Sequence, residues 1–338
     1  MNAVTDHPEL ARAVQAGVPL IPRPFAAIAE QVGMDEAHAR ATLKRWQDDE
    51  ILREISAVLE GSAFGWESAL VAGRVPADRI EEVAAIVGAH PNVTHNYERN
   101  HAFNLWFTLS VPPRMGLANT LRMLEEEADV ERFWALPRTR TFKIAVRMDP
   151  TTKRNRSHGH ARKEPVARIE TTERDELMFR LLQTPLPFVE EPFAALGAPH
   201  GISGEELVAF GTKHMKGAVR RYAATFHHRK LGVKGNVMSA WAVPADRVEE
   251  IGLALADLPE VSHCYARKLY DVFPFTLYAM IHGPDQEACG EIAVRLAADL
   301  GVDTPAMLQS TREFKKCRLR YFLPSMEDWW SARVEGGA

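Results

Sequence analysis

The spacing of apolar residues predicts that the chain opens with a pair of helices. The first begins near Pro24 and is broken at Gly33, and its apolar residues recur every three or four positions. These residues share one helix face: Phe25, Ile28, Ala29 and Val32. A second helix follows from Asp35, whose side chain suits an N-cap. Two helices joined by a short glycine turn predict a helix-turn-helix.

The pattern after this pair predicts an alternation of strands and helices. Strands are expected at 53–60, 68–75, 93–100, 103–111 and 141–147, and helices at 78–87 and 115–127. From residue 68 onward the order is β-α-β-β-α-β, which is ferredoxin-like. Such a sheet carries its helices on one face, so its other face must be covered or serve as a binding surface.

The second half of the chain repeats the first. Val75-Pro-Ala-Asp-Arg-Ile-Glu-Glu recurs as Val243-Pro-Ala-Asp-Arg-Val-Glu-Glu, which sets the offset between the two copies. The same offset matches Phe107-Thr-Leu109 with Phe275-Thr-Leu277, and nearer the end it grows by four, where Arg140 matches Arg312. The predicted fold is therefore α+β, an internally duplicated unit of helix-turn-helix plus ferredoxin-like domain.

The repeat sets the expected domain boundaries. Helix-turn-helix domains are expected at 1–60 and 166–218, and ferredoxin-like domains at 61–150 and 219–338. Residues 151–165 are polar and basic without apolar periodicity, so they are expected to form a surface linker.

Composition narrows the class of protein. The 338 residues are 46% hydrophobic and 25% charged, as in soluble globular proteins. No apolar run reaches the roughly 18 residues of a membrane span, and the N-terminus lacks the pattern of a secretory signal, so a cytoplasmic protein is expected. The three cysteines form no CxxC pair, and no dedicated metal site is expected. The formal net charge of −4 disfavours nucleic acid as the main partner.

One expected strand in the second half carries unusual polar residues. Alternation puts Arg221, Thr225, His227 and Arg229 on one face and aims His228 the other way, together with Arg220, unless a bulge intervenes. A face this basic suits an anionic ligand, although basic residues also protect a solvent-exposed edge strand from aggregation. In the first half only one of these polar residues has a counterpart, Arg53, which corresponds to Arg221. Arg53 is therefore expected to contribute less to turnover than Arg221 and Arg229.

A second polar row lies in the first half. Tyr97, Arg99 and His101 share a strand face, and the counterpart of His101 is Leu269. Two facing sheets could bring His101 and His227 into one cleft, which predicts one working pocket and one degraded pocket. The alternative for His101 is a structural histidine near a strand bend.

These motifs resemble known families. Residues 35–55, DEAHARATLKRWQDDEILREI, are similar to the recognition helix and following strand of the Lrp/AsnC regulators. Residues 97–109, YERNHAFNLWFTL, and 220–238, RRYAATFHHRKLGVKGNVM, resemble the signatures of the siroheme decarboxylases in their fused two-unit form. The resemblance implies a lyase that removes CO2 from the C12 and C18 acetates of siroheme. Its product, 12,18-didecarboxysiroheme, leads to heme d1 or to heme by an alternative route.

Roles for individual residues follow from that chemistry. His101 and His227 are the expected proton donors, although one of them could instead bind the substrate iron, and Arg99, Arg221 and Arg229 are the expected carboxylate anchors. Further substrate-binding residues are expected to be Tyr97, Arg220, His228, Arg267, Trp106 and Met238. Trp106 and Met238 could equally be plain core. No cofactor is expected beyond the iron of the substrate, and neighbouring tetrapyrrole-pathway enzymes are the expected protein partners.

The rival function is a ligand-responsive transcriptional regulator. It is favoured by the helix-turn-helix and by Arg40, Lys44 and Arg45. It is disfavoured by the acidic run Asp48-Asp-Glu50 that follows them and by the net charge. A heme carrier without catalysis is a third interpretation.

Overall fold

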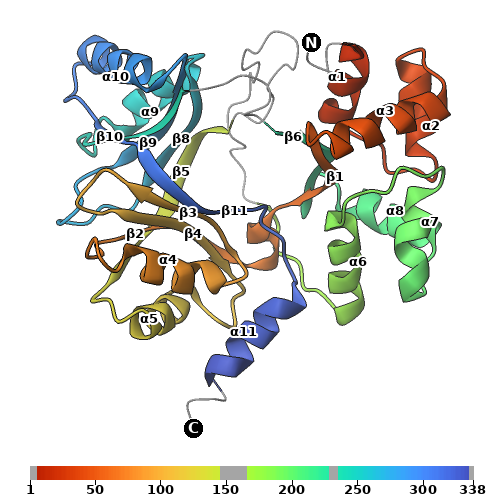
Figure 1. Ribbon diagram of the computed structural model, residues 1–338, viewed down its shortest axis with the longest axis horizontal. Coiled ribbons are helices and arrows are strands. Elements are labelled where there is room, and N and C mark those ends of the chain that lie inside the picture. Colours follow the sequence, from red (N-terminus) through yellow and green to blue (C-terminus); the bar gives the residue numbers. More distant parts are fainter. Residues whose placement is uncertain (1–5, 145–165, 228–234, 335–338) are drawn as a thin grey trace.

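A computed structural model describes residues 6–144, 166–227 and 235–334. These residues form two lobes, one mainly helical and one built on a large sheet (Figure 1). The helical lobe contains α1 (Pro8–Ala16), α2 (Pro24–Gln31), α3 (Glu36–Asp48), α6 (Glu173–Gln183), α7 (Pro192–Gly197), η3 (Ala198–His200), α8 (Gly204–His214), β1 (Leu52–Leu59) and β6 (Val219–Phe226). Both halves of the chain contribute to it, so the lobes do not correspond to the halves of the chain.

Local sequence explains why both helix-turn-helix units form. In the first, Asp35 caps α3 by accepting a hydrogen bond from the backbone N–H of His38. In the second, Ser203 caps α8 in the same way. The turns before them need left-handed backbone, which Gly33 (φ 67°) and Gly201 (φ 66°) supply. The two glycines are separated by the same offset as the two copies of the sequence repeat, so the duplicated helix pairs are confirmed.

The strands that follow the two helix pairs join each other. β1 and β6 form their own antiparallel two-stranded sheet, with Ala57 opposite Tyr222. The sequence interpretation instead placed β6 in the second ferredoxin-like domain, whose start was set at residue 219. The reason for the difference is burial, because Tyr222, Ala224 and Phe226 of β6 pack in the core of the helical lobe. The two helical units thus share one core.

The second lobe is one sheet of nine strands, ordered β10-β7-β9-β8-β5-β2-β4-β3-β11. The strands are β2 (Glu67–Gly73), β3 (Val93–Arg99), β4 (Leu105–Val111), β5 (Phe133–Ile144), β7 (Gly235–Trp241), β8 (Val261–Arg267), β9 (Leu277–Gly283), β10 (Ala306–Leu308) and β11 (Ser310–Lys316). The helices on its outer faces are α4 (Ile80–Ala89), α5 (Leu117–Glu127), α9 (Val248–Asp257) and α10 (Gln286–Leu300). The first pair lies below the sheet and the second above it (Figure 1).

The two ferredoxin-like units exchange the ends of their last strands. The first part of β5 pairs with β2 of its own unit, and the part from Arg138 onward pairs with β8 of the other. In the second unit β10 pairs with its own β7, while β11 pairs with β3 of the first. Only Gln309 separates β10 from β11, so the two edges of the sheet are joined. This exchange explains why β5 begins at Phe133, well before the expected strand at 141–147.

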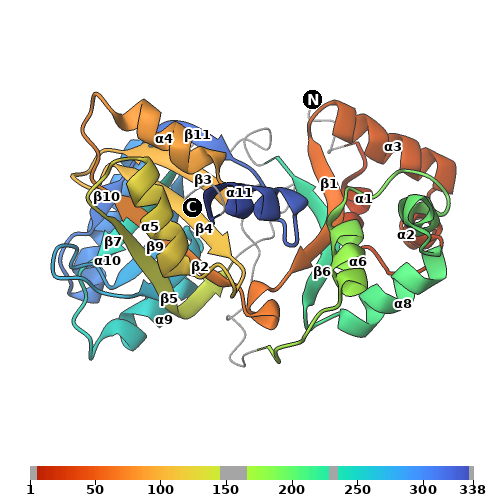
Figure 2. The same cartoon turned by 90° about the horizontal axis from the view of Figure 1, so that it is seen from below.

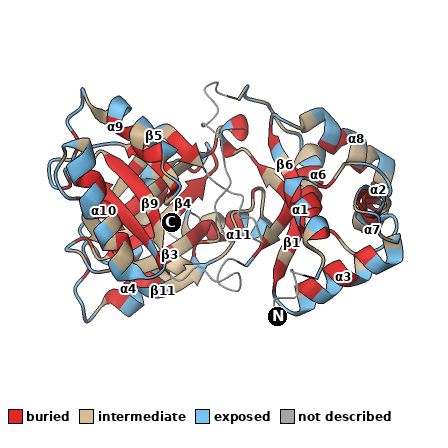
Figure 3. Cartoon of the chain, turned by 90° about the horizontal axis from the view of Figure 1, so that it is seen from above, coloured by how far each residue is buried: buried red, intermediate tan, exposed pale blue. Residues whose placement is uncertain are grey.

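The exchange places the helix-free faces of the two units against each other. Their contact is a buried apolar core from both halves: Ala72, Phe103, Trp106, Leu136, Met238, Ala240, Phe273, Tyr278 and Leu308. Figure 3 shows buried strands in the middle of this lobe and exposed outer faces on its helices. Trp106 and Met238, expected to line a tetrapyrrole slot, are 1% and 7% exposed and belong to this core.

Pairing also corrects the register of the repeat. Asn104 forms hydrogen bonds with the backbone of Val75, and Thr276 forms equivalent hydrogen bonds with the backbone of Val243. Asn104 and Thr276 are therefore structural equivalents, but they are four residues further apart in the sequence than Val75 and Val243 are. The four extra residues therefore lie in the loop between β8 and β9, and the first offset fails before Phe107 rather than after it. Matching Phe107-Thr-Leu109 with Phe275-Thr-Leu277 was wrong, because only strand pairing locates an insertion in a loop.

A C-terminal segment that the sequence pattern did not predict links the lobes. After β11 the chain crosses to the β1–β6 sheet and ends in α11 (Pro324–Val334), which lies between the lobes when the molecule is seen from below (Figure 2). Met326 and Trp329 of α11 are buried against the first ferredoxin-like unit. Among the described residues, no helix has the length and apolar character needed to cross a lipid bilayer.

Candidate functional site between the lobes

The predicted alternation along β6 holds over most of the strand. Tyr222, Ala224 and Phe226 face the helical core, so Arg221 and Thr225 lie on the opposite face, away from the helices. The register is irregular near Arg220, because Val58 pairs with Arg221 while Leu59 pairs with Val219. Arg220 was expected on the face of Tyr222. It is exposed instead, with its Nε 3.6 Å from a carboxylate oxygen of Glu60.

The start of β1 approaches the first ferredoxin-like unit at a cluster that we call the interdomain cluster: Arg53, His95, Tyr97, Glu313 and Lys316. β11 pairs with β3 so that Lys316 lies opposite His95 and Glu313 opposite Tyr97. Burial lowers the pKa of His95 to about 4, and the charges of Lys316 and Arg53 lower it further. His95 is therefore neutral near pH 7 in a setting rich in positive charge. The charge of Arg53 thus acts on this histidine, and the expectation that Arg53 matters less than Arg221 stays a prediction.

His227 lies at the same end of the two-stranded sheet. It follows β6 directly, is exposed, and its backbone N–H donates a 2.9 Å hydrogen bond to the carbonyl of Ile51. Ile51 immediately precedes β1, so His227 lies beside the part of β1 that carries Arg53. His228 and Arg229 lie outside the described residues, so the choice between His227 and His228 stays a prediction.

The equivalent place in the second unit is filled by protein. Its cluster consists of Glu60, Arg138, Arg220, Tyr265 and Tyr321. The Tyr321 side chain packs against the 3-10 helix η2 (Gly61–Phe64), and a Cβ on Gly61 would lie 2.6 Å from the phenol oxygen. Burial raises the pKa of Tyr321 to about 12, with the Arg138 and Arg220 charges opposing the rise. Tyr321 and Glu60 thus occupy and partly neutralise this second cluster.

Arg99 and Arg267 hold equivalent positions inside the sheet lobe. Each donates from Nη1 to a backbone carbonyl near the strand exchange, Arg99 to Leu308 and Arg267 to Leu136. Burial lowers the pKa of each guanidinium to about 10. In both, the Nε–H is buried and lacks a hydrogen-bond partner among the described residues. Each guanidinium also lies over a tyrosine ring, 5.4 Å from the Tyr97 centroid in the first unit. Their roles as substrate anchors stay predictions.

His101 lies beyond the end of β3 that is farther from His95. Lys316, opposite His95, leads into the chain that reaches β1, whereas Arg99 marks the far end of β3. His101 lies just beyond the end of β3, in a bend where its backbone N–H donates a 2.9 Å hydrogen bond to the Arg99 carbonyl. The expectation that facing sheets bring His101 and His227 into one cleft stays a prediction.

The surroundings of His101 are aromatic. Its ring lies 5.7 Å from Phe273 and 6.3 Å from Phe275, measured between centroids. The backbone N–H of Phe103 donates to Nδ1 of His101, which leaves the proton of the neutral ring on Nε2. Burial lowers the pKa of His101, and the nearby charge of Arg74 adds to the effect.

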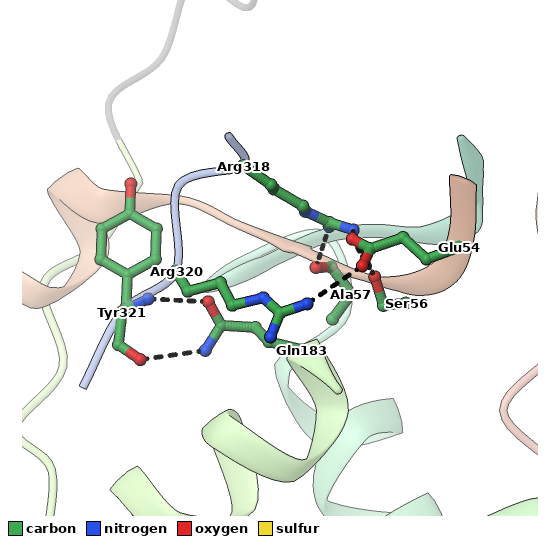
Figure 4. A network of polar contacts seen from close by, with 7 residues as sticks. All are labelled: Glu54, Ser56, Ala57, Gln183, Arg318, Arg320 and Tyr321. Carbon is green, nitrogen blue, oxygen red and sulfur yellow. Dashed lines mark hydrogen bonds and ion pairs between the residues drawn. The ribbon is translucent and has the colours of Figure 1, made fainter. Parts of the chain in front are cut away.

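Sequence patterns missed a polar network between β1 and the C-terminal segment (Figure 4). Arg318 bonds to Glu54, to Ser56 Oγ and to the Ala57 carbonyl, and Arg320 lies 3.1 Å from the second oxygen of Glu54. Although burial by itself raises the pKa of Glu54, the two arginines hold it below its ordinary value. Neither arginine matches a motif, because only the path of residues 317–322 brings them to β1.

Two basic residues of the first helix-turn-helix are paired with acidic side chains. On α3, Arg40 lies 3.8 Å from Glu36 and 3.6 Å from Glu190 of the second unit, and Lys44 is paired with Asp48. Ion pairs of this kind compete with contacts to DNA phosphates. Within the described ranges, no group of three His, Cys, Asp or Glu side chains is placed to hold a metal ion.

Comparison with known proteins agrees with this architecture. Residues 63–143 and 230–315 match the model of the AsnC-like ligand binding domain, and residues 9–53 match the siroheme decarboxylase NirDL-like HTH domain. The siroheme decarboxylase of Hydrogenobacter thermophilus is 36% identical over 333 residues, which cover 96% of this chain and 98% of that protein. The NirDL subunit of Paracoccus denitrificans siroheme decarboxylase is 33% identical over 306 residues, covering 89% of this chain and 93% of that one.

A solved structure extends the likeness to three dimensions. The crystal structure of the siroheme decarboxylase NirDL in complex with an iron-uroporphyrin III analogue has a TM-score of 0.81 and 32% sequence identity to this chain. The match covers 98% of this chain and 99% of the other. Such identity along nearly the whole of both chains places the duplicated helix-turn-helix and ferredoxin-like units in a single family. The chain belongs to the siroheme decarboxylases.

Proposed function

We propose that this chain is an enzyme that decarboxylates siroheme. The observation that carries the proposal is the near full-length likeness to a siroheme decarboxylase, at 36% identity over 96% of the chain. The reaction that we infer removes CO2 from the C12 and C18 acetates and yields 12,18-didecarboxysiroheme. That makes the protein a carbon–carbon lyase. The likeness to a structure in complex with an iron-uroporphyrin III analogue supports a substrate of the same tetrapyrrole class.

We place the reaction at the interdomain cluster. Siroheme carries a carboxylate on each of its acetate and propionate side chains, so its site needs several cations. Arg53 and Lys316 supply positive charge beside His95, and Arg221 lies on the β6 face that points away from the helices. Glu313 is the acidic member of the cluster. The net positive charge favours a polyanionic ligand over a neutral one.

The chemistry requires a proton at the carbon that loses CO2. The bond between the methylene carbon and the carboxylate breaks, CO2 leaves, and the electron pair stays on that carbon. A proton then completes the methyl group, and His227 is the proposed donor, with solvent restoring its proton afterwards. The arginines hold carboxylates that remain on the ring, so the departing acetate is oriented without being stabilised as an anion.

The proposal needs no cofactor beyond the iron that enters with siroheme. Electrons balance within the substrate, because the pair released by the broken bond is the pair that receives the proton. The product would serve heme d1 synthesis or an alternative route to heme, and enzymes of those routes are the proposed protein partners. Activity that persists in protein treated with a chelator before siroheme is added supports this; activity that needs an added metal or organic cofactor contradicts it.

The alternative function is a transcriptional regulator of the Lrp/AsnC type. The helix-turn-helix favours it, but the pairing of Arg40 and Lys44 with acidic side chains weighs against it. Anaerobic incubation of the purified protein with siroheme distinguishes a decarboxylase from a carrier and from a regulator. We expect loss of one and then two CO2 by mass spectrometry. Binding without mass loss would indicate a carrier, and neither binding nor loss would reject the proposed function.

A further inference from the structure

The network around Glu54 has more positive than negative charge. One carboxylate serves two guanidinium groups, those of Arg318 and Arg320, and the Glu54 side chain is 7% exposed. Its pKa stays below the ordinary value despite burial, so it is ionised and the trio carries a net charge of about +1 near neutral pH. The surplus positive charge is on a side chain that solvent reaches, so it can attract an anion.

The two arginines differ in how far they are satisfied. Arg318 is engaged by Glu54, Ser56 and the Ala57 carbonyl, and its side chain is 16% exposed. Arg320 uses Nη2 for Glu54, which is its one ion partner among the described residues, and its side chain is 37% exposed. Arg318 therefore fixes the segment, while Arg320 keeps N–H groups available.

The backbone around Arg320 is held firmly in place. The N–H of Tyr321 donates to Gln183 Oε1 at 2.8 Å, and Gln183 Nε2 donates back to the Tyr321 carbonyl at 3.2 Å (Figure 4). Both arginine side chains approach Glu54 from this segment. Glu54 lies next to Arg53, opposite Thr225 of β6, on the sheet face that points away from the helices. Arg320 is thus prepositioned beside the interdomain cluster.

We propose that Arg320 is a further substrate-binding residue that pairs with a carboxylate of the tetrapyrrole that is retained in the product. The inference rests on the proposed function. A guanidinium paired with the departing acetate would stabilise the ground-state charge that decarboxylation removes, and would slow the reaction. Arg320 therefore suits a propionate side chain. The C-terminal segment of the second unit then completes a site whose other residues lie on β1, β3, β6 and β11.

The test compares two ligands and three forms of the protein. Anaerobic absorption titrations would give the dissociation constants of siroheme and of 12,18-didecarboxysiroheme for wild type, Arg320→Gln and Arg320→Lys. We expect Arg320→Gln to weaken both ligands in parallel by about 10- to 100-fold, the loss of one charge-assisted hydrogen-bonded pair. KM should rise while kcat changes by less than about threefold. Arg320→Lys should recover part of the affinity.

Arg295→Gln is the matched control, because Arg295 is an exposed arginine with a carboxylate partner, Glu260 at 3.4 Å, on the far helix α10. It should bind both ligands as wild type does. Thermal unfolding of each variant separates lost binding from lost folding. Unchanged affinity in folded Arg320→Gln overturns the proposal, as does weaker binding of siroheme alone, which would assign Arg320 to a departing acetate. Wild type that binds siroheme without turnover would reject the proposed function instead.

Discussion

Arg99 and Arg267 are buried equivalents, each donating a hydrogen bond to the backbone where the strand of one unit passes to the other. Both clamp the exchange between the units, and both have an Nε–H without a partner in the part of the chain that the structure describes. They differ in surroundings, because Arg99 shares its strand with His95 and Tyr97 of the interdomain cluster. A substitution at Arg267 is thus a control for the structural effect of the same substitution at Arg99.

We expect Arg99→Gln and Arg267→Gln to destabilise the fold by similar amounts, since each loses the same clamp. Only Arg99→Gln should weaken siroheme binding, by about 10- to 100-fold for one lost charge-assisted hydrogen bond. Urea unfolding and anaerobic titration measure the two effects. Equal loss of affinity in both variants would show that the clamp, not the site, accounts for binding.

The two histidines should behave differently. With His227 at the interdomain cluster and His101 in an aromatic setting at the far end of β3, we expect His227→Ala to slow decarboxylation by about 10²–10⁴ while siroheme still binds. His101→Ala should then affect turnover through packing alone. Single-turnover assays with mass detection give the rates. A large loss in His101→Ala with wild-type rates in His227→Ala would move the site to the aromatic end.

One siroheme should bind to each chain. The duplicated unit offers two equivalent places, but Tyr321 and Glu60 fill the one in the second unit, where Gly61 leaves no room beside the phenol. Both acetates must then leave from one site, so the monodecarboxylated intermediate has to reorient between steps. Stoichiometric titration followed by absorbance measures this. A second equivalent bound with comparable affinity would show that the second cluster opens.

Specific DNA binding should be absent. Arg40 and Lys44 of α3, which would meet a phosphate backbone, are paired with Glu36, Glu190 and Asp48. Gel-shift and footprinting experiments at low and moderate salt test this expectation. Nanomolar binding that selects a sequence and weakens steeply with salt would restore the regulator interpretation.

Stability should fall as the pH drops below about 6.5. His90 is fully buried beneath Trp329, and burial, aided by the charges of Lys315 and Arg333, lowers its pKa from 6.5 to about 3. The unfolded chain therefore binds a proton between these values that the folded chain does not, so folding loses up to about 1.4 kcal/mol per pH unit for this group. Above the unfolded pKa the effect vanishes.

Urea unfolding between pH 7.5 and 5 measures this slope. In His90→Asn, which keeps an acceptor for the Asn92 N–H but has no titrating ring, the slope should be smaller. An identical slope in the variant would assign the acid sensitivity to other groups.

Local sequence patterns determined much of the secondary structure. The spacing of apolar residues predicted the first helix pair and the repeat predicted the second, the cap at Asp35 follows from short-range hydrogen bonding, and the alternation along β6 separated Arg221 from Tyr222. These features depend on neighbours in the chain, so a single sequence contains them. The repeat and two motifs were enough to indicate the family.

Tertiary structure decided how the copies combine. Which unit β5 and β11 pair with depends on contacts between residues far apart in sequence, and hydrophobic periodicity does not specify a partner strand. That pairing located the insertion before β9 and carried Arg318 and Arg320 to Glu54. The sequence by itself thus determined the elements, the duplication and the chemistry of the side chains, whereas long-range packing determined which of those side chains meet.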